Sequence, residues 1–151
     1  MINGFYIPRR DIFLEKELRH GETGNAKFLR LVRNGKGRWQ RPVHEVLTVE
    51  GETKKLTSPL LHYSHKNFSG FIAKINYYTD INSKYLFGNG VKTSLPAIFF
   101  YPLAKFILNY ILKKGFMDGT PGFLHAMGMS FHSFLTRAKL YLIWKKRAGN
   151  K

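Results

Sequence analysis

Residues 28–39 read Phe28-Leu-Arg-Leu-Val-Arg-Asn-Gly-Lys-Gly-Arg-Trp39, which combines a strand-like run with a strong turn signal. Side chains alternate across a strand, so residues 28, 30 and 32 would share one face and residues 29, 31 and 33 the other. The turn signal is Asn34 to Gly37, because asparagine and glycine tolerate the positive φ angles of tight turns. A second strand-like run follows at residues 43–49. This stretch predicts that the first part of the chain is built from strands.

The pattern on both sides extends this prediction to residues 1–65. Residues 2–7 alternate loosely and end at Pro8, which suits a short strand or a sheet edge. Residues 11–20 fit either a helical turn or a loop. A further strand is predicted at residues 60–63. We expect these elements to form a small β-rich unit.

Residues 66–151 have a helical pattern instead. Apolar residues recur at helical spacing from Ser69, which suits an N-cap, to about residue 88. Residues 95–112 are strongly apolar, and residues 123–147 form a long third pattern that ends in a basic cluster. The sequence therefore predicts an α+β fold, with a β-rich unit at 1–65 and a helical, basic, membrane-associating region at 66–151.

The apolar segment 95–112 is interrupted by Pro96, Pro102, Lys105 and Asn109. A spanning helix needs about 20 mostly apolar residues with few charges, and this segment falls short of that requirement. We therefore predict amphipathic helices in the membrane interface, with basic residues near anionic headgroups. The residues expected to contact the membrane are Phe99, Phe100, Phe106, Trp144, Lys145 and Lys146.

The charge of the chain is uneven. The whole sequence has 25 Lys and Arg against 9 Asp and Glu, for a net charge of +16. Residues 1–53 carry ten basic and seven acidic residues, whereas residues 54–151 carry fifteen and two. A cationic half can face nucleic acid or an anionic membrane. The aromatic residues of segment 95–112 sit among aliphatic residues, which favours the membrane. The sequence has no cysteine, which excludes disulfides and thiolate metal sites.

His44 and Glu45 are the sharpest catalytic candidates. A carboxylate beside an imidazole can act as a general base, and the imidazole can bind a metal ion or a phosphate. The alternative is a surface pair on a strand edge, which the dipeptide by itself favours. Nearby arginines can bind phosphate oxygens in bidentate fashion or can line a solvated strand face. These arginines are Arg30, Arg33, Arg38 and Arg41.

Trp39, His62 and Asp118 each raise a separate question. Trp39 can stack on a sugar or a base, or it can anchor a core, which is the favoured role for the residue taken alone. His62 and His65 do not share a face of a strand, so their spacing does not predict a metal site. Asp118 is one of two acids after residue 53, and its default interpretation is an ion pair with a neighbouring lysine.

Two ordered blocks of sequence carry a family resemblance. The first runs from the Phe28 strand through Trp39 and Val43-His-Glu45 to Leu60-Leu-His-Tyr-Ser-His65. The second runs from Lys74-Ile-Asn-Tyr-Tyr78 to Lys114-Gly-Phe-Met-Asp-Gly-Thr-Pro-Gly-Phe123. Together they resemble the family-2 glycosyltransferases of the lipopolysaccharide-core type over nearly the whole chain.

The resemblance implies a GT-A nucleotide-sugar fold and sugar transfer with inversion. In that family a carboxylate deprotonates the acceptor hydroxyl, and a divalent metal, Mg or Mn, on an Asp-x-Asp motif steadies the leaving nucleoside diphosphate. Carried over, Glu45 is the base and His44 lies beside the metal or diphosphate. The residues that the resemblance places along the substrate pocket are Arg30, Arg33, Trp39, Arg41 and His62.

The sequence departs from the family in one respect, because it has no Asp-x-Asp motif and no opening strand-helix repeat. We therefore expect the C-terminal portion of the enzyme, as a fragment, a split gene product or a truncated gene model, which binds no metal and is inactive alone.

The expected partners are a nucleotide sugar and a glycan or lipid acceptor in the complete enzyme, an anionic membrane surface and a separate N-terminal half. The expected location is peripheral, on the cytoplasmic face of the inner membrane. The alternatives are a non-enzymatic basic membrane-binding module and a nucleic-acid-binding domain.

Overall fold

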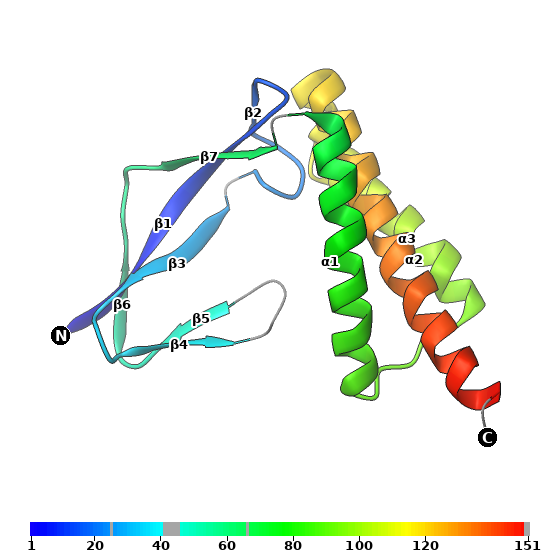
Figure 1. The fold of residues 1–151 in the computed structure, drawn as a ribbon. Coiled ribbons are helices and arrows are strands. Elements are labelled where there is room, and N and C mark those ends of the chain that lie inside the picture. The colour runs from blue at the N-terminus through cyan, green and yellow to red at the C-terminus, as the bar shows by residue number, and fades with distance from the viewer. Residues whose placement is uncertain (25, 41–45, 66, 150–151) are drawn as a thin grey trace.

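The computed structural model describes residues 1–24, 26–40, 46–65 and 67–149. The predicted α+β fold is confirmed, with strands up to His65 and helices from Phe68 onward (Figure 1). The strands are β1 (Ile2–Phe13), β2 (Lys16–Leu18), β3 (Lys27–Val32), β4 (Gly37–Gln40), β5 (Val46–Val49), β6 (Glu52–Lys55) and β7 (Leu60–His65). The helices are α1 (Phe68–Gly88), α2 (Leu95–Phe106), the π-helix η1 (Ile107–Leu112), the 3-10 helix η2 (Gly115–Asp118) and α3 (Gly119–Gly149).

The long strand β1 is the centre of the main sheet. Its first half pairs with β3 on one side, antiparallel, and with β6 on the other, parallel. Its second half pairs with β2, antiparallel, and with β7, parallel. Residues more than forty positions apart, such as Asp11 and His62, therefore become neighbours on adjacent strands.

The predicted turn at residues 34–37 is confirmed, since the Lys36 amide donates to the Arg33 carbonyl at 3.0 Å and Gly35 has a φ of +77°. The strand after this turn does not return along β3. Instead, β4 pairs with β5 in a separate two-stranded sheet, with Gln40 opposite Val46.

Two expectations for the N-terminal region were wrong. The first strand does not end at Pro8 but continues to Phe13. Pro8 has no amide hydrogen to donate, and its position opposite Lys27 does not require one. The hydrogen bonding resumes at the next residue, where the Arg9 amide donates to the Ala26 carbonyl. The region from residue 11 to residue 20 is neither a helical turn nor a plain loop. It completes β1, turns at residues 14 and 15 with positive φ angles, and forms β2.

The three long helices form one layer beside the strands, and α3 lies against both α1 and α2 (Figure 1). The N-cap of α1 is Asn67 rather than Ser69, because the Asn67 side chain accepts from the Gly70 amide at 2.7 Å. Helix α3 begins at Gly119 and not at residue 123. Pro121 lies in its first turn, where a backbone amide has no partner within the helix, so the missing amide hydrogen of proline is tolerated there.

The hydrophobic core lies where the strands meet the helices. Phe13 and Leu18 are buried there with Phe71 and Ile75 of α1. The ring of Phe13 meets Phe71 edge-on with centroids 4.9 Å apart, and His125 of α3 stacks on Phe71 at 5.7 Å. One aromatic cluster therefore holds strands and helices together.

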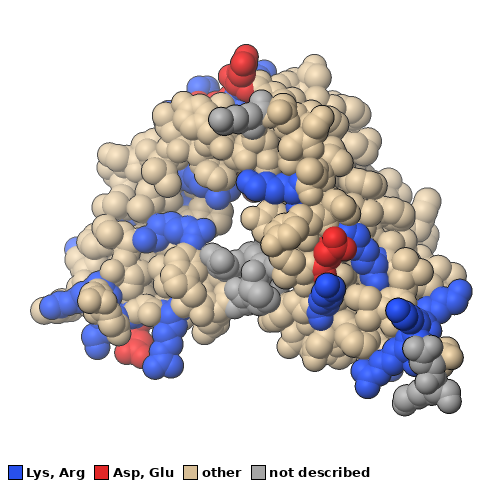
Figure 2. All heavy atoms as spheres, viewed as in Figure 1, with Lys and Arg blue, Asp and Glu red and all other residues tan. Residues whose placement is uncertain are grey.

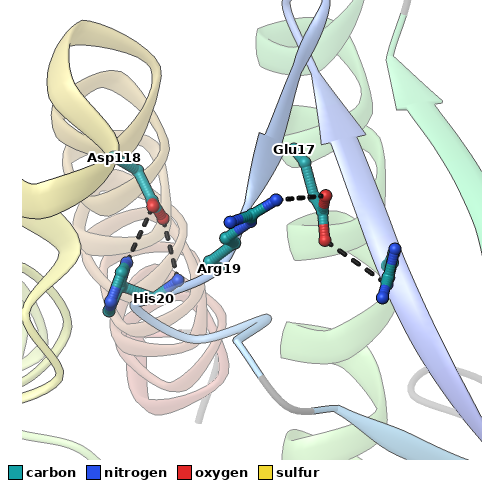
Figure 3. Close-up of polar contacts among 5 residues, drawn as sticks. Glu17, Arg19, His20 and Asp118 are labelled. Atoms are coloured by element: carbon teal, nitrogen blue, oxygen red, sulfur yellow. Dashed lines mark hydrogen bonds and ion pairs between the residues drawn. The ribbon is translucent and has the colours of Figure 1, made fainter.

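A buried carboxylate forms a second link between the two layers. Asp118 accepts from the backbone amide of His20 at 2.8 Å and contacts the His20 Nδ1 at 2.8 Å (Figure 3). The partner of Asp118 is thus a histidine from the loop after β2 and not a neighbouring lysine as expected. Figure 3 also shows Glu17 beside Arg19, on the strand side of this link.

Candidate functional site

A row of stacked aromatic and guanidinium groups crosses one face of the strands. The Arg30 guanidinium lies 4.9 Å from the Trp39 ring and 5.7 Å from the Phe28 ring. The Arg9 guanidinium lies 4.2 Å from the centroid of the same Phe28 ring. Cations stack on aromatic faces because the ring carries negative charge there. The row joins β4, β3 and β1.

The row ends in a buried carboxylate and a histidine. The Arg9 Nε donates to Asp11 Oδ2 at 2.9 Å, and the other oxygen of Asp11 lies 2.6 Å from His62 Nδ1. Asp11 is 2% exposed, whereas the His62 side chain is 44% exposed. We call the whole set, Trp39, Arg30, Phe28, Arg9, Asp11 and His62, the sheet strip.

The sheet strip combines three kinds of chemistry. Trp39 is 54% exposed, so its ring can stack on the face of a sugar. The arginines can donate to hydroxyl or phosphate oxygens. The Asp11 carboxylate beside Nδ1 of His62 favours the tautomer that carries its hydrogen on Nδ1, so that Nε2 can accept a proton. The same contact holds the imidazole ring in place. The strip is thus equipped to hold a polyhydroxylated ligand and to accept a proton.

The structure brings three of the predicted substrate-binding residues into this strip, namely Arg30, Trp39 and His62. The core role considered for Trp39 is not observed, because the ring is exposed and stacked on Arg30. Arg33 lies apart from the strip, and its guanidinium contacts the Met1 sulfur. The predicted Arg41, His44 and Glu45 lie outside the described residues.

Sequence reasoning missed Arg9, Asp11 and Phe28 as members of the strip. Alternation was the available signal, because residues 9 and 11 share a face of any strand that continues past Pro8. The pairing of Asp11 with His62 depends on the parallel register of β1 and β7, which no local pattern reveals.

The chain is similar over almost its whole length to a known protein. The chain is 29% identical over 143 residues to the "Lipopolysaccharide core biosynthesis glycosyltransferase LpsC" of Rhizobium meliloti (strain 1021). The chain is similar to the C-terminal part of that glycosyltransferase. The predicted resemblance to a glycosyltransferase of lipopolysaccharide-core biosynthesis is therefore confirmed.

The aligned region covers different shares of the two proteins. The aligned region is 93% of this chain but 53% of LpsC, so the chain spans about half the length of that relative. No protein-family model and no solved structure matches the chain.

The described residues do not fit the metal site of the resembled family. No group of three or more His, Cys, Asp and Glu side chains within residues 1–24, 26–40, 46–65 and 67–149 is placed to hold a metal ion. Asp11 and His62 form a pair, and the nearby His65 turns away to pack on Phe71 with ring centroids 4.8 Å apart.

His65 and His125 are neutral members of the aromatic core. Burial lowers the pKa of His65 from 6.5 to about 4, and the positive charge of Lys74 acts in the same direction. Burial likewise lowers the pKa of His125, while the carboxylate of Glu22 opposes that shift. Both rings therefore pack as uncharged aromatic groups at neutral pH.

This burial predicts that the protein loses stability as the pH falls from 7 to 5. The unfolded chain protonates His65 near pH 6.5 and the folded chain only near pH 4, so the unfolded state binds more protons in between. Urea unfolding at pH 7, 6 and 5 measures the effect. The variant His65→Gln cannot titrate, and its stability should fall less over this range. An equal fall in both proteins would remove His65 as a cause.

Proposed function

We propose that this chain is the C-terminal, acceptor-side part of an inverting glycosyltransferase. The complete enzyme transfers a sugar from a nucleotide sugar to a lipopolysaccharide-core or other cell-envelope glycan at the cytoplasmic face of the inner membrane. The single observation that carries this proposal is the alignment of 93% of the chain with LpsC. The sheet strip supports it, because a stacked tryptophan and arginine are suited to a sugar acceptor.

In this proposal the chain positions the acceptor and accepts its proton. Trp39 stacks on the acceptor ring while Arg30 donates to its hydroxyl groups. Glu45 is the proposed general base, and His44 is proposed to lie beside the diphosphate. A divalent metal, Mg or Mn, would steady the leaving nucleoside diphosphate. The resembled family holds that metal on an Asp-x-Asp motif, which this sequence lacks, so we assign the metal to the N-terminal half of the complete enzyme.

The N-terminal half also has a proposed place on this chain. Figure 2 shows a hollow between the strands and the helices, with Lys and Arg side chains on its rim. A basic rim suits a partner that carries a nucleoside diphosphate. We propose that the donor-binding half sits over this hollow.

A transfer assay tests the proposed division of labour. The chain is incubated with a mixture of labelled nucleotide sugars and a lipopolysaccharide-core acceptor, with and without an N-terminal half supplied in trans. We expect no turnover from the chain alone and measurable transfer from the two halves together. Robust turnover by the chain alone would contradict the need for a second half. An inactive assembly, with both halves folded, would contradict the transferase function.

The helices carry an exposed apolar surface that supports membrane association. Residues Leu95–Leu112 are long and apolar enough to cross a membrane by length and composition, contrary to the shortfall expected from sequence, and 6% of them are buried. Phe99 and Phe100 on α2 are 69% and 61% exposed. Apolar patches of this kind on soluble proteins mark protein or membrane contacts.

The contacts of Glu22 favour a helix that lies in the interface over one that spans the bilayer. Lys105 Nζ donates to Glu22 Oε1 at 2.9 Å, and Asn109 Nδ2 donates to Glu22 Oε2 at 3.1 Å. Burial would raise the pKa of Glu22, but the hydrogen bond and charge of Lys105 lower it below 4.5. Glu22 belongs to the loop after β2, so a spanning helix would place that loop inside the hydrocarbon, where irregular backbone is not tolerated.

The other predicted membrane residues are placed differently. Phe106 is half-buried against Tyr110 and Phe123. The Trp144 ring packs on Phe87, and its Nε1 donates to the Val91 carbonyl at 2.8 Å. Lys145 and Lys146 are exposed at the end of α3. We therefore propose Phe99 and Phe100 as the main apolar membrane contacts, with the two lysines near headgroups.

Vesicle flotation tests the membrane surface. The double variant Phe99→Ser/Phe100→Ser should bind vesicles containing anionic lipid about tenfold more weakly, because each phenylalanine loses apolar burial. The matched control is Tyr77→Ser/Tyr78→Ser, which removes two consecutive exposed aromatic residues from α1. Equal losses in both variants would argue against a specific membrane face. A wild-type protein that ignores vesicles but retards oligonucleotides would favour the nucleic-acid alternative.

A further inference from the structure

A cavity of about 530 Å³ lies among α1, α2, α3 and the segment that joins α1 to α2. This volume falls within the range of small-molecule sites, which is about 300–1,000 Å³. Its lining is mixed, with apolar and polar side chains in similar numbers. The apolar part includes Leu86, Ala97, Ala104, Leu108, Met129 and Leu140.

The polar part of the wall is dominated by Arg137 of α3. Its guanidinium lies 3.7 Å from the centroid of the Tyr101 ring, and its Nη1 donates to the Ser133 hydroxyl at 2.9 Å. The ion pairs among the described residues do not include Arg137. Burial lowers the pKa of this guanidinium, and the Tyr101 contact opposes that shift. Arg137 is thus a half-buried cation held by an aromatic ring and neutral oxygens.

Two hydroxyl groups in the same wall have no hydrogen-bond partner among the described residues. Thr136 is 3% exposed, and its Oγ1 is buried without a partner. The Oγ1 of Thr93, which also belongs to the lining, is likewise buried without a partner. Both oxygens are closed to solvent in the free protein, so a ligand in the cavity reaches them only if the threonine side chains rotate toward it. A buried polar group without a partner is unfavourable, so native proteins seldom leave one unless a ligand or water uses it.

The acidic residue of the wall is already used. Glu22 is paired with Lys105 and Asn109, which leaves Arg137 and the exposed Lys92 as the unmatched charges of the lining. A ligand that fits must therefore be anionic where it meets Arg137. The apolar side chains of the wall suit an apolar group on the rest of the ligand.

We propose that this cavity binds a lipid with a phosphate headgroup. The phosphate lies at Arg137, Thr136 and Thr93, and the first part of an acyl chain follows the apolar wall. The choice of a lipid over a free phosphate rests on the apolar lining and on the proposed membrane contact of α2, which forms one wall of the cavity. A bound lipid would fix α2 against α3 at the membrane surface.

The chain contains a built-in reporter for this site. It has two tryptophans, and Trp144 donates its indole hydrogen to the carbonyl of Val91, which lines the cavity. In a Trp39→Phe background, Trp144 is the sole tryptophan. Its emission is recorded during titration with soluble dihexanoyl phosphatidic acid, so that binding is measured without a membrane. Inorganic phosphate and dihexanoylglycerol, which present the two halves of the ligand separately, are titrated in parallel.

We expect saturable binding of the short-chain phosphatidic acid, with both half-ligands at least tenfold weaker. Arg137→Gln should raise the Kd at least tenfold, because it removes the charge-assisted hydrogen bonds to phosphate. Thr136→Val should raise it about threefold without lowering the Tm, since the hydroxyl it removes has no partner in the free protein. Arg137→Lys keeps the charge and should retain most of the binding. Lys36→Gln removes an equal charge from the β3–β4 turn and should change nothing.

Three results would overturn the proposal. The first is the absence of saturable binding by the wild-type chain. The second is an unchanged Kd in Arg137→Gln; if that variant does not fold, an unchanged Kd in Thr136→Val decides the matter. The third is inorganic phosphate binding as tightly as the lipid, which would show an anion site without a lipid. Because none of these measurements uses sugar transfer or vesicles, they fail independently of the proposed function.

Discussion

Replacing Gly128 with alanine should lower the free energy of unfolding by about 3 kcal/mol. A Cβ atom at this position of α3 would lie 2.2 Å from Cε1 of Phe71, which is far closer than non-bonded carbons approach in real structures. The ring cannot move aside easily, because it is 3% exposed and is held between Phe13 and His125. Inserting atoms into a well-packed core typically lowers stability by about 1–3 kcal/mol. Urea unfolding followed by circular dichroism measures the change.

The same substitution at Gly88 is the matched control. Gly88 ends α1, and an added Cβ there meets nothing within 4 Å. Alanine in a helix without a clash is more stable than glycine by about 0.5–1 kcal/mol, so Gly88→Ala should be neutral or stabilising. The double variant Gly128→Ala/Phe71→Leu should recover part of the loss, because the shorter side chain leaves room. A Gly128→Ala protein as stable as the wild type would contradict the tight α1–α3 contact.

Local patterns were sufficient to predict elements that depend on neighbouring residues. The Asn34-Gly35 turn needs residues that tolerate positive φ, and the strand before it alternates visibly. Apolar spacing likewise indicated α1 and the segment Leu95–Leu112. In these cases the forces that form the element act within a few residues, so the sequence displays them directly.

The remainder depends on contacts between distant residues. Asp118 binds His20 across 98 positions, and Asp11 binds His62 across 51. The parallel pairing of β1 with β7 that creates the second contact needs a long connection, whose path no turn signal encodes. The cavity around Arg137 similarly requires the packing of three helices. The candidate residues Arg30, Trp39 and His62 were identified from the sequence, but their connection through Phe28, Arg9 and Asp11 was not.

The largest effect on activity is expected from Glu45→Gln in the assembled enzyme. If the Glu45 carboxylate takes the acceptor proton, its loss should lower kcat by about 10²–10⁴-fold, the usual contribution of a general base. The KM for the nucleotide sugar should change little, because donor binding is proposed for the other half. Initial rates at varied donor and acceptor concentrations separate the two parameters.

The sheet strip contains an alternative proton acceptor, and variants at Glu45 and His62 distinguish the two candidates. The Asp11–His62 pair presents an imidazole nitrogen at the other end of the sheet strip from Trp39 and Arg30, so His62→Gln serves as the comparison. If Glu45 is the base, His62→Gln affects the KM for the acceptor more than kcat, since it then removes only a contact. If Glu45→Gln keeps most of its kcat while His62→Gln loses it, the proton goes to the imidazole. In that case Asp11 holds the ring for catalysis, and the catalytic role moves from the β4–β5 connection to the pairing of β1 with β7.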